Sequence, residues 1–203
     1  MRTMENKTPI RKKAVETRQR LLMATIRQVA EKGYHSITVD EIAKACGLST
    51  GSAYRYFKNK KEMLIAAIEY CFANIQEFSG TEDRKLNEFD TLEDMFAYAL
   101  DQFYLLHRKY YGIHEELESL RHIDEDIREV YQKITENAIE ALVLKCPEPM
   151  RELPDLRERL YVAIGILDHY AHMQMDEKAW QGIDMEQMKA VSIAAAASVM
   201  KNK

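Results

Sequence analysis

The sequence predicts an all-α protein of about nine helices. Its 203 residues include only seven Gly and four Pro, and the helix-favouring residues Ala, Leu, Met, Glu, Lys and Gln dominate the composition. Apolar residues recur at helical spacing along nearly the whole chain, and no segment reads convincingly as a strand. With 46% hydrophobic and 31% charged residues, the chain can build a packed core beneath a charged surface.

Capping residues mark the helices expected in the N-terminal part. Thr38 and Glu41 form a capping box, and Gly47 ends the helix that follows them. Ser49 and Asn59 are suited to cap the next two helices, because their side-chain oxygens can accept hydrogen bonds from exposed amides. The helices expected here cover about residues 14–32, 39–46, 50–56 and 60–78.

The helices of the C-terminal part are separated by two loops. A polar loop is expected at 79–90, and a second at 146–154, which holds three Pro. The helices expected here are one that Thr91 caps and that extends to at least Leu106, and four over about 113–120, 124–145, 155–176 and 184–201.

The charge of the chain is unevenly distributed. The net charge is −4, but residues 1–64 hold fourteen Lys and Arg against six Asp and Glu, a balance of +8, and residues 65–203 have a balance of −12. Such asymmetry favours nucleic-acid contact by the basic part. The alternative is a solvated basic tail, since Arg11, Lys12 and Lys13 are typical of a flexible arm.

Two short helices joined at a glycine, after a longer helix, predict a helix-turn-helix. Ala43 is small where the two helices meet, and Gly47 suits a positive φ in the turn. The helix at 50–56 would enter the major groove of DNA. Small residues at its start let the backbone approach DNA, and free amides there favour phosphate. Tyr54 and Lys60 suit contacts with the phosphate backbone.

The segment TVDEIAKACGLSTGSAYRYFKNKKEML, residues 38–64, resembles the DNA-binding signature of the TetR/AcrR family of bacterial transcriptional regulators. The resemblance covers about residues 15–64, with Ala53 as a departure where the family often has a larger aliphatic residue. It implies a basic arm (1–13), a helix-turn-helix domain (14–60) and a helical regulatory and dimerisation domain (61–203).

The resemblance also implies which side chains face DNA. Arg55 could read guanine or be an ordinary surface residue, and Tyr56 could face DNA or pack in the core. Phe57 is expected to pack inside. The expected DNA-facing residues are Thr38, Thr50, Gly51, Ser52, Tyr54, Arg55, Tyr56 and Lys60.

The last two helices predict a homodimer. Residues 190–200 are eleven consecutive uncharged, mostly small residues, and a helix that is apolar all round must be covered all round. The alternative is a buried hairpin in a monomer. The expected dimer residues are Val162, Ile166, Met173, Ala195 and Val199.

The family resemblance implies a small-molecule pocket in the same region, although the aromatic and Met stripe that suggests its walls is also typical of ordinary core. The acidic balance of this region suits a cationic ligand or a solvated surface equally. The candidate wall residues are Met95, Tyr98, Phe103, Tyr104, Tyr110, Tyr111 and His114.

A metal site is not expected from the sequence. Asp168 and His172 are four residues apart and share a helix face, with His169 beside them, but no third ligand is evident. A hydrogen-bonded role is the alternative that the sequence favours. We therefore expect no metal and no cofactor.

The sequence thus predicts a cytoplasmic repressor that binds a palindromic duplex operator as a homodimer and leaves it when a small molecule binds. Two alternatives remain: an activator whose C-terminal domain binds a protein, and an enzyme with an added helix-turn-helix. The enzyme is disfavoured because no catalytic signature is present. The scattered Cys46, Cys71 and Cys146 indicate reduced thiols, and neither a signal peptide nor a membrane-spanning segment is evident.

Overall fold

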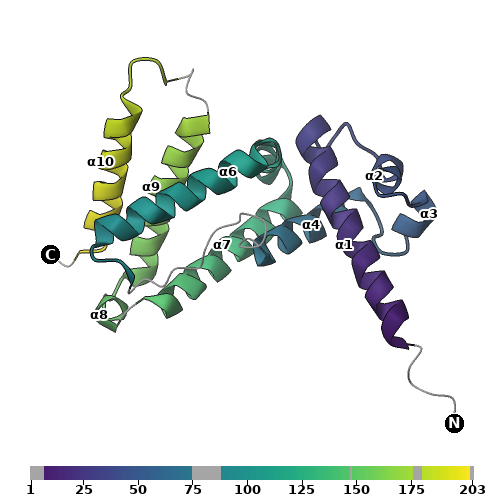
Figure 1. Ribbon diagram of the computed structural model, residues 1–203, viewed down its shortest axis with the longest axis horizontal. Helices are drawn as coiled ribbons and strands as arrows, with labels where there is room; N and C mark the ends of the chain where they lie inside the picture. Colours follow the sequence, from purple (N-terminus) through teal and green to yellow (C-terminus); the bar gives the residue numbers. More distant parts are fainter. Residues whose placement is uncertain (1–6, 75–87, 147, 176–179, 202–203) are drawn as a thin grey trace, which may run out of the picture. The chain divides into compact units, whose positions relative to one another are not determined.

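The computed structural model describes residues 7–74, 88–146, 148–175 and 180–201, which contain nine α-helices and no strand (Figure 1). The predicted all-α fold is therefore confirmed for this part of the chain. The helices are α1 (Lys7–Lys32), α2 (Val39–Ala45), α3 (Thr50–Ala53), α4 (Lys60–Ala73), α6 (Leu92–Ile123), α7 (Glu125–Lys145), α8 (Glu148–Arg151), α9 (Leu156–Met175) and α10 (Met185–Val199).

The chain forms two compact units, and each unit is built from two separate segments of the sequence. The N-terminal unit comprises Met1–Asn74 together with Gly112–Val130, and the C-terminal unit comprises Ile75–Tyr111 together with Tyr131–Lys203. Helices α6 and α7 therefore contribute residues to both units. The N-terminal unit thus includes the end of α6 and the beginning of α7, whereas the domain boundary expected from the sequence lies at residue 60.

In the N-terminal unit, α1 packs against α2 and α4, and α2 packs against α3. The apolar stripes predicted for α1 and α4 face this core. Burial of these side chains supplies the main stabilisation of the unit. Its fully buried large side chains are Leu21, Leu22, Ile37, Ile42, Met63, Leu64, Ile68, Leu120 and Ile127.

In the C-terminal unit, α9 packs against α10. Tyr170 is almost completely buried, and its hydroxyl donates a hydrogen bond to the carbonyl of Met185 at 3.3 Å. Small residues of α10, Ala196 and Ala197, are fully buried against the same core. The rest of this core includes Met95, Phe96, Leu100, Ile139, Leu156, Leu160, Ala163 and Leu167.

The helices differ from the prediction in two stretches of the C-terminal part of the sequence. The helices expected to end near 106 and to cover 113–120 are one helix, α6. A single Gly112 inside it costs only about 1 kcal/mol relative to Ala, and Ile113 and Leu117 continue the buried stripe beyond it. The expected loop 146–154 contains α8, whose Pro149 lies in its first turn, where proline is tolerated.

The other differences concern shorter stretches. Helix α3 ends at Ala53 rather than 56, and α1 begins at Lys7, within the expected flexible arm. The end expected for α4, residues 75–78, lies outside the described residues. Among the helices that the structure describes, none combines the length and apolarity needed to cross a membrane.

The thiols of Cys46, Cys71 and Cys146 form no disulfide. Burial raises the pKa of the Cys71 thiol to about 12 and also raises the pKa of the other two thiols. All three are therefore protonated at neutral pH, so the thiolate needed for nucleophilic or redox chemistry is scarce.

Gly47 adopts a φ of +67°, as predicted for the turn between α2 and α3. We expect Gly47→Ala to lower the free energy of unfolding by about 1–2 kcal/mol, because a Cβ is strained in the left-handed region. Gly51→Ala is the matched control: its φ is not positive and an added Cβ meets nothing within 4 Å. It should be neutral or stabilising by up to about 1 kcal/mol. Urea denaturation followed by circular dichroism measures both, and equal stability of the two variants would contradict this turn geometry.

Candidate nucleic-acid interface

The second and third helices meet through fully buried alanines. Ala43 of α2 and Ala53 of α3 each have 0% exposed surface. The turn between the helices is closed by the Leu48 amide, which donates to the carbonyl of Ala43 at 2.9 Å. Phe57 is buried, as predicted, and the guanidinium of Arg18 lies 5.3 Å from its ring centre. Small residues at these positions let the two helices approach closely.

Helix α2 begins with the predicted capping box. The Thr38 amide donates to the Glu41 carboxylate at 2.9 Å, and the Glu41 amide donates to the Thr38 hydroxyl oxygen at 3.2 Å. Hydrogen bonds from the hydroxyl and amide of Thr38 lower the pKa of the Glu41 carboxyl. Thr38 thus positions the start of α2, while its exposed side chain keeps the predicted DNA contact possible.

Polar side chains at the start of α3 bind one another. The Ser52 amide donates to the Ser49 hydroxyl oxygen at 3.2 Å, and the Thr50 hydroxyl donates to Asp40 of α2 at 2.5 Å. The expectation that the amides of this helix are free to bind phosphate is therefore wrong for Ser52. Hydrogen bonds from Lys44 and Thr50 lower the pKa of the Asp40 carboxyl, which keeps it an acceptor that joins the two short helices.

Three residues of α3 and the turn that follows it are accessible to solvent. Gly51 and Arg55 are exposed, and Tyr54 has 52% of its surface exposed. The guanidinium of Arg55 donates to the Ser52 hydroxyl at 3.2 Å. This hydrogen bond orients the side chain but uses only one of the five N–H donors of the guanidinium. Tyr56 is half-buried, so its burial does not decide between the DNA contact and the core packing that the sequence left open.

Lys60 has a structural role that the sequence did not indicate. Its ammonium donates to the carbonyls of Tyr34 and Ile37 at 2.7 and 2.8 Å, and it lies 4.4 Å from the centre of the Tyr34 ring. Burial lowers the pKa of this ammonium. Two of its three donors thus hold the segment between α1 and α2, and the third remains for the predicted phosphate contact.

Residues of α6 and of the segment before α7 hold the helix-turn-helix within the N-terminal unit. Glu116 accepts a hydrogen bond from the Tyr34 amide. Lys61 of α4 pairs with Asp124 at 2.9 Å and with Asp126 at 2.5 Å, and these hydrogen bonds raise the pKa of Lys61. Sequence reasoning missed these contacts because the partners lie more than sixty residues apart.

The candidate pocket residues are distributed over α6 rather than confined to one exposed wall. Met95 is buried in the core of the C-terminal unit, and the rings of Tyr98 and Phe89 are 5.3 Å apart. Phe103 and Tyr104 are half-buried, and the Phe103 ring is 6.1 Å from that of His107. The side chains of Tyr110 and Tyr111 lie outside the described residues, so their place in a pocket stays a prediction, as does that of His114.

The predicted dimer residues divide between surface and core. Val162 is 51% exposed, whereas Met173 is 4% exposed. Met173 is therefore buried inside its own unit and cannot contribute to a partner contact as the periodicity suggested. Ile166, Ala195 and Val199 are half-buried. Sequence reasoning overlooked Tyr161 and Val191, which are 63% and 62% exposed.

These features define a helix-turn-helix protein of the DNA-binding class. Residues 21–67 match the sequence profile described as bacterial regulatory proteins, tetR family. The chain is similar to the TetC protein of transposon Tn10 from Escherichia coli, with 32% identity over 98 residues, covering 48% of this chain and 50% of TetC. It spans about half or less of the length of the curated relatives it matches. The chain is thus similar to bacterial regulatory proteins of the tetR family over residues 21–67, and curated relatives such as the HTH-type transcriptional regulator CymR of Pseudomonas putida are regulators.

Solved structures share the fold over nearly the whole chain. A TetR-family regulator from Rhodococcus has a TM-score of 0.70 at 17% identity and covers 92% of this chain and 100% of its own. The regulator FadR from Bacillus subtilis, solved in complex with stearoyl-CoA, has a TM-score of 0.66 at 22% identity and covers 89% of this chain and 98% of its own. At these identities the similarity shows the fold alone.

The position of Lys60 leads to a prediction about stability. Lys60→Met keeps the aliphatic part of the side chain but removes the donors to Tyr34 and Ile37. We expect it to lower the free energy of unfolding by about 1–3 kcal/mol, the usual contribution of a hydrogen bond to a charged group. Lys58→Met, at an exposed position two residues earlier, is the control and should change stability little. Thermal denaturation without DNA measures the stability of both variants. If Lys60→Met is as stable as the original protein, the hydrogen bonds of Lys60 do not stabilise the fold, and DNA contact is the only role left for this side chain.

Proposed function

We propose that the protein is a cytoplasmic, homodimeric repressor that binds a palindromic duplex operator and is released from it by a small molecule. The observation that carries this proposal is the exposed group Gly51, Tyr54 and Arg55, held by a helix-turn-helix whose two short helices are fixed by side-chain caps and buried alanines. A rigid scaffold with a few accessible side chains is what groove recognition needs.

Charge supports the DNA-binding role. The first 64 residues carry a balance of +8, although the whole chain is at −4. Phosphate neutralisation by this basic part would bring the protein to any duplex and make affinity fall steeply with salt. Sequence preference would then come from base-edge contacts, for which Arg55 has the donor geometry that suits guanine.

A partner surface on α9 and α10 supports the dimer. Tyr161, Val162 and Val191 are large apolar side chains with more than half of their surface exposed. Near them in sequence, Gly165 and Ala194 are exposed and small, which permits close approach of two helices. A two-fold dimer places two copies of α3 roughly 34–36 Å apart, so that they reach successive major grooves of a palindrome.

Release by a small molecule is proposed from the fold. FadR, solved with stearoyl-CoA, shares this fold. In this chain, α6 contributes Leu92–Tyr111 to the C-terminal unit and Gly112–Ile123 to the N-terminal unit, where Glu116 accepts from the Tyr34 amide. A ligand that binds one arrangement of α6 better than another would shift DNA affinity by that difference, and only by that difference.

The DNA-binding proposal predicts the effects of two substitutions on affinity. Selection of bound sequences from a random duplex pool should yield a two-fold palindrome. Arg55→Ala should then weaken binding to the selected duplex by about 1–3 kcal/mol and relax the preference at one base pair of each half-site. Tyr54→Phe should weaken binding about equally for all sequences, because a phosphate contact carries no sequence information.

Arg128→Ala is the control for these variants, because Arg128 is an exposed arginine of the same unit that lies on α7 and pairs with Glu125. It should leave both affinity and sequence preference unchanged. Enrichment of no motif, with binding that depends only on salt, would overturn the proposal of a sequence-specific operator.

The dimer proposal predicts a change in molecular mass. Val162→Arg combined with Val191→Arg should convert the dimer to a monomer, because each places an unpaired charge in a buried contact. Leu144→Arg is the control: Leu144 is 75% exposed on α7 of the same unit and outside the proposed surface. Analytical ultracentrifugation distinguishes the results. A dimer that survives the double substitution would place the partner contact elsewhere.

A further inference from the structure

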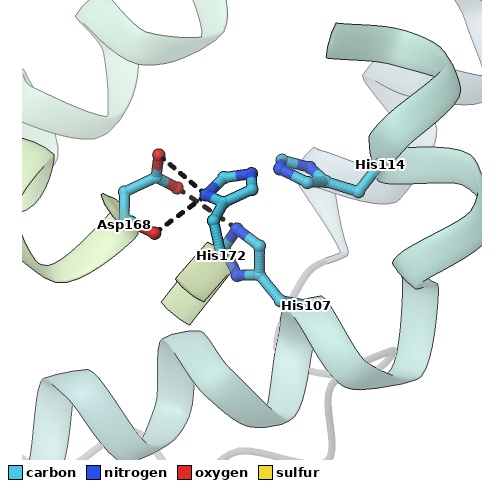
Figure 2. A group of neighbouring side chains, drawn as sticks. All are labelled: His107, His114, Asp168 and His172. Atoms are coloured by element: carbon cyan, nitrogen blue, oxygen red, sulfur yellow. Dashed lines mark hydrogen bonds and ion pairs between the residues drawn. The ribbon is translucent and has the colours of Figure 1, made fainter. Parts of the chain in front are cut away.

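Three potential metal ligands of the C-terminal unit gather where α6 contributes His107 and α9 contributes Asp168 and His172 (Figure 2). One ligand atom from each of the three lies within 4.8 Å of the others. The sequence showed only the pair on α9, because the third ligand lies on another helix, more than fifty residues earlier.

The hydrogen bonds of His107 fix its tautomer. Its Nδ1 lies 2.7 Å from the carbonyl oxygen of Phe103, and a carbonyl can only accept, so Nδ1 carries the proton. In a neutral ring the lone pair is then on Nε2, which lies 3.2 Å from a carboxylate oxygen of Asp168. Two acceptors that face each other at this distance require a cation between them or an added proton on the ring.

A backbone carbonyl also fixes the tautomer of His172. Its Nδ1 lies 2.8 Å from the backbone carbonyl oxygen of Asp168 and 3.4 Å from a carboxylate oxygen of the same residue, which leaves Nε2 as the lone-pair nitrogen of the neutral ring. The His107 and His172 rings are 4.7 Å apart at 73°. Histidines that bind metals usually donate the other ring N–H to a carbonyl or carboxylate, which fixes the ring and raises its basicity. Both histidines therefore have the outer hydrogen bond that a metal ligand needs.

The donor set selects the class of ion. Imidazole nitrogens with one carboxylate suit Zn²⁺ and its transition-metal neighbours, whereas Mg²⁺ and Ca²⁺ prefer oxygen alone. A tetrahedral site with bonds of about 2.0–2.1 Å places ligand atoms about 3.3–3.4 Å apart. The His107–Asp168 separation of 3.2 Å is close to this value, and small side-chain rotations bring the other donors together from at most 4.8 Å.

Burial favours an ion at this position. The His107 side chain is 5% exposed, whereas the Asp168 and His172 side chains are 42% and 27% exposed. The cluster is thus shielded on the α6 side and open enough on the α9 side for an ion to enter. We propose that His107, Asp168 and His172 bind one divalent transition-metal ion of the zinc class.

The test uses the full-length protein after treatment with a chelator. Co²⁺ is titrated while its visible absorption is recorded, because low-symmetry tetrahedral coordination is distinguished from hexa-aquo Co²⁺ by its spectrum. Zn²⁺ is then added in competition. We expect one Co²⁺ per chain, displaced by one Zn²⁺. Because this measurement contains no DNA, its failure would leave the proposed regulatory function untouched.

Three variants place the ion. Asp168→Asn and His172→Gln change partly exposed side chains, so both should fold, and circular dichroism checks that they do. Each should weaken Co²⁺ binding by more than the about 10–100-fold typical of outer-shell changes. His169→Gln alters an exposed histidine of the same helix that is outside the cluster, and it should bind like the unchanged protein.

Two results would overturn the proposal. One is the absence of saturable Co²⁺ or Zn²⁺ binding by the folded protein, which would mean that a proton on His107 meets Asp168 instead. The other is equal affinity in all three variants, which would place the ion at a different group of side chains.

Discussion

The contact between α2 and α3 is the constraint on which the DNA-binding surface depends. These helices have seven and four residues, far below the length at which an isolated helix is stable in water. They persist because Ala43 and Ala53 are fully buried and because side chains satisfy their terminal amides. The accessible positions of Tyr54 and Arg55 follow from this packing, so any change that separates the two helices also displaces the residues that would touch DNA.

Local sequence patterns predicted the features that arise from local interactions. The capping box at Thr38, the cap at Asn59, the positive φ of Gly47 and the burial of Phe57 each depend on residues a few positions apart. The same reasoning failed at Gly112, which is unfavourable in a helix but lies inside α6 because buried apolar residues on both sides of it pack against the core. The free energy of this tertiary packing outweighs the low helix propensity of glycine.

Contacts between distant residues could not be predicted in this way. Lys60 was expected to meet phosphate, yet its ammonium lies between the carbonyls of Tyr34 and Ile37. Asp168 and His172 were seen as a pair without a third ligand, and His107 supplies one from another helix. In each case the partner of the side chain depends on helix packing that spacing along the chain does not encode.

Helix α6 connects the two parts of the molecule that a regulator must couple. It carries His107 in the C-terminal unit and Glu116 in the N-terminal unit, where Glu116 binds the amide next to the segment that Lys60 holds. The carboxylates that Lys61 binds are partly exposed, and exposed ion pairs contribute little to stability. Allosteric coupling between sites is typically only about 1–3 kcal/mol. Under the proposed release by a small molecule, contacts of this modest strength can hold the helix-turn-helix in one arrangement and be given up in another, whereas the packing of the buried Ala43 and Ala53 stays intact.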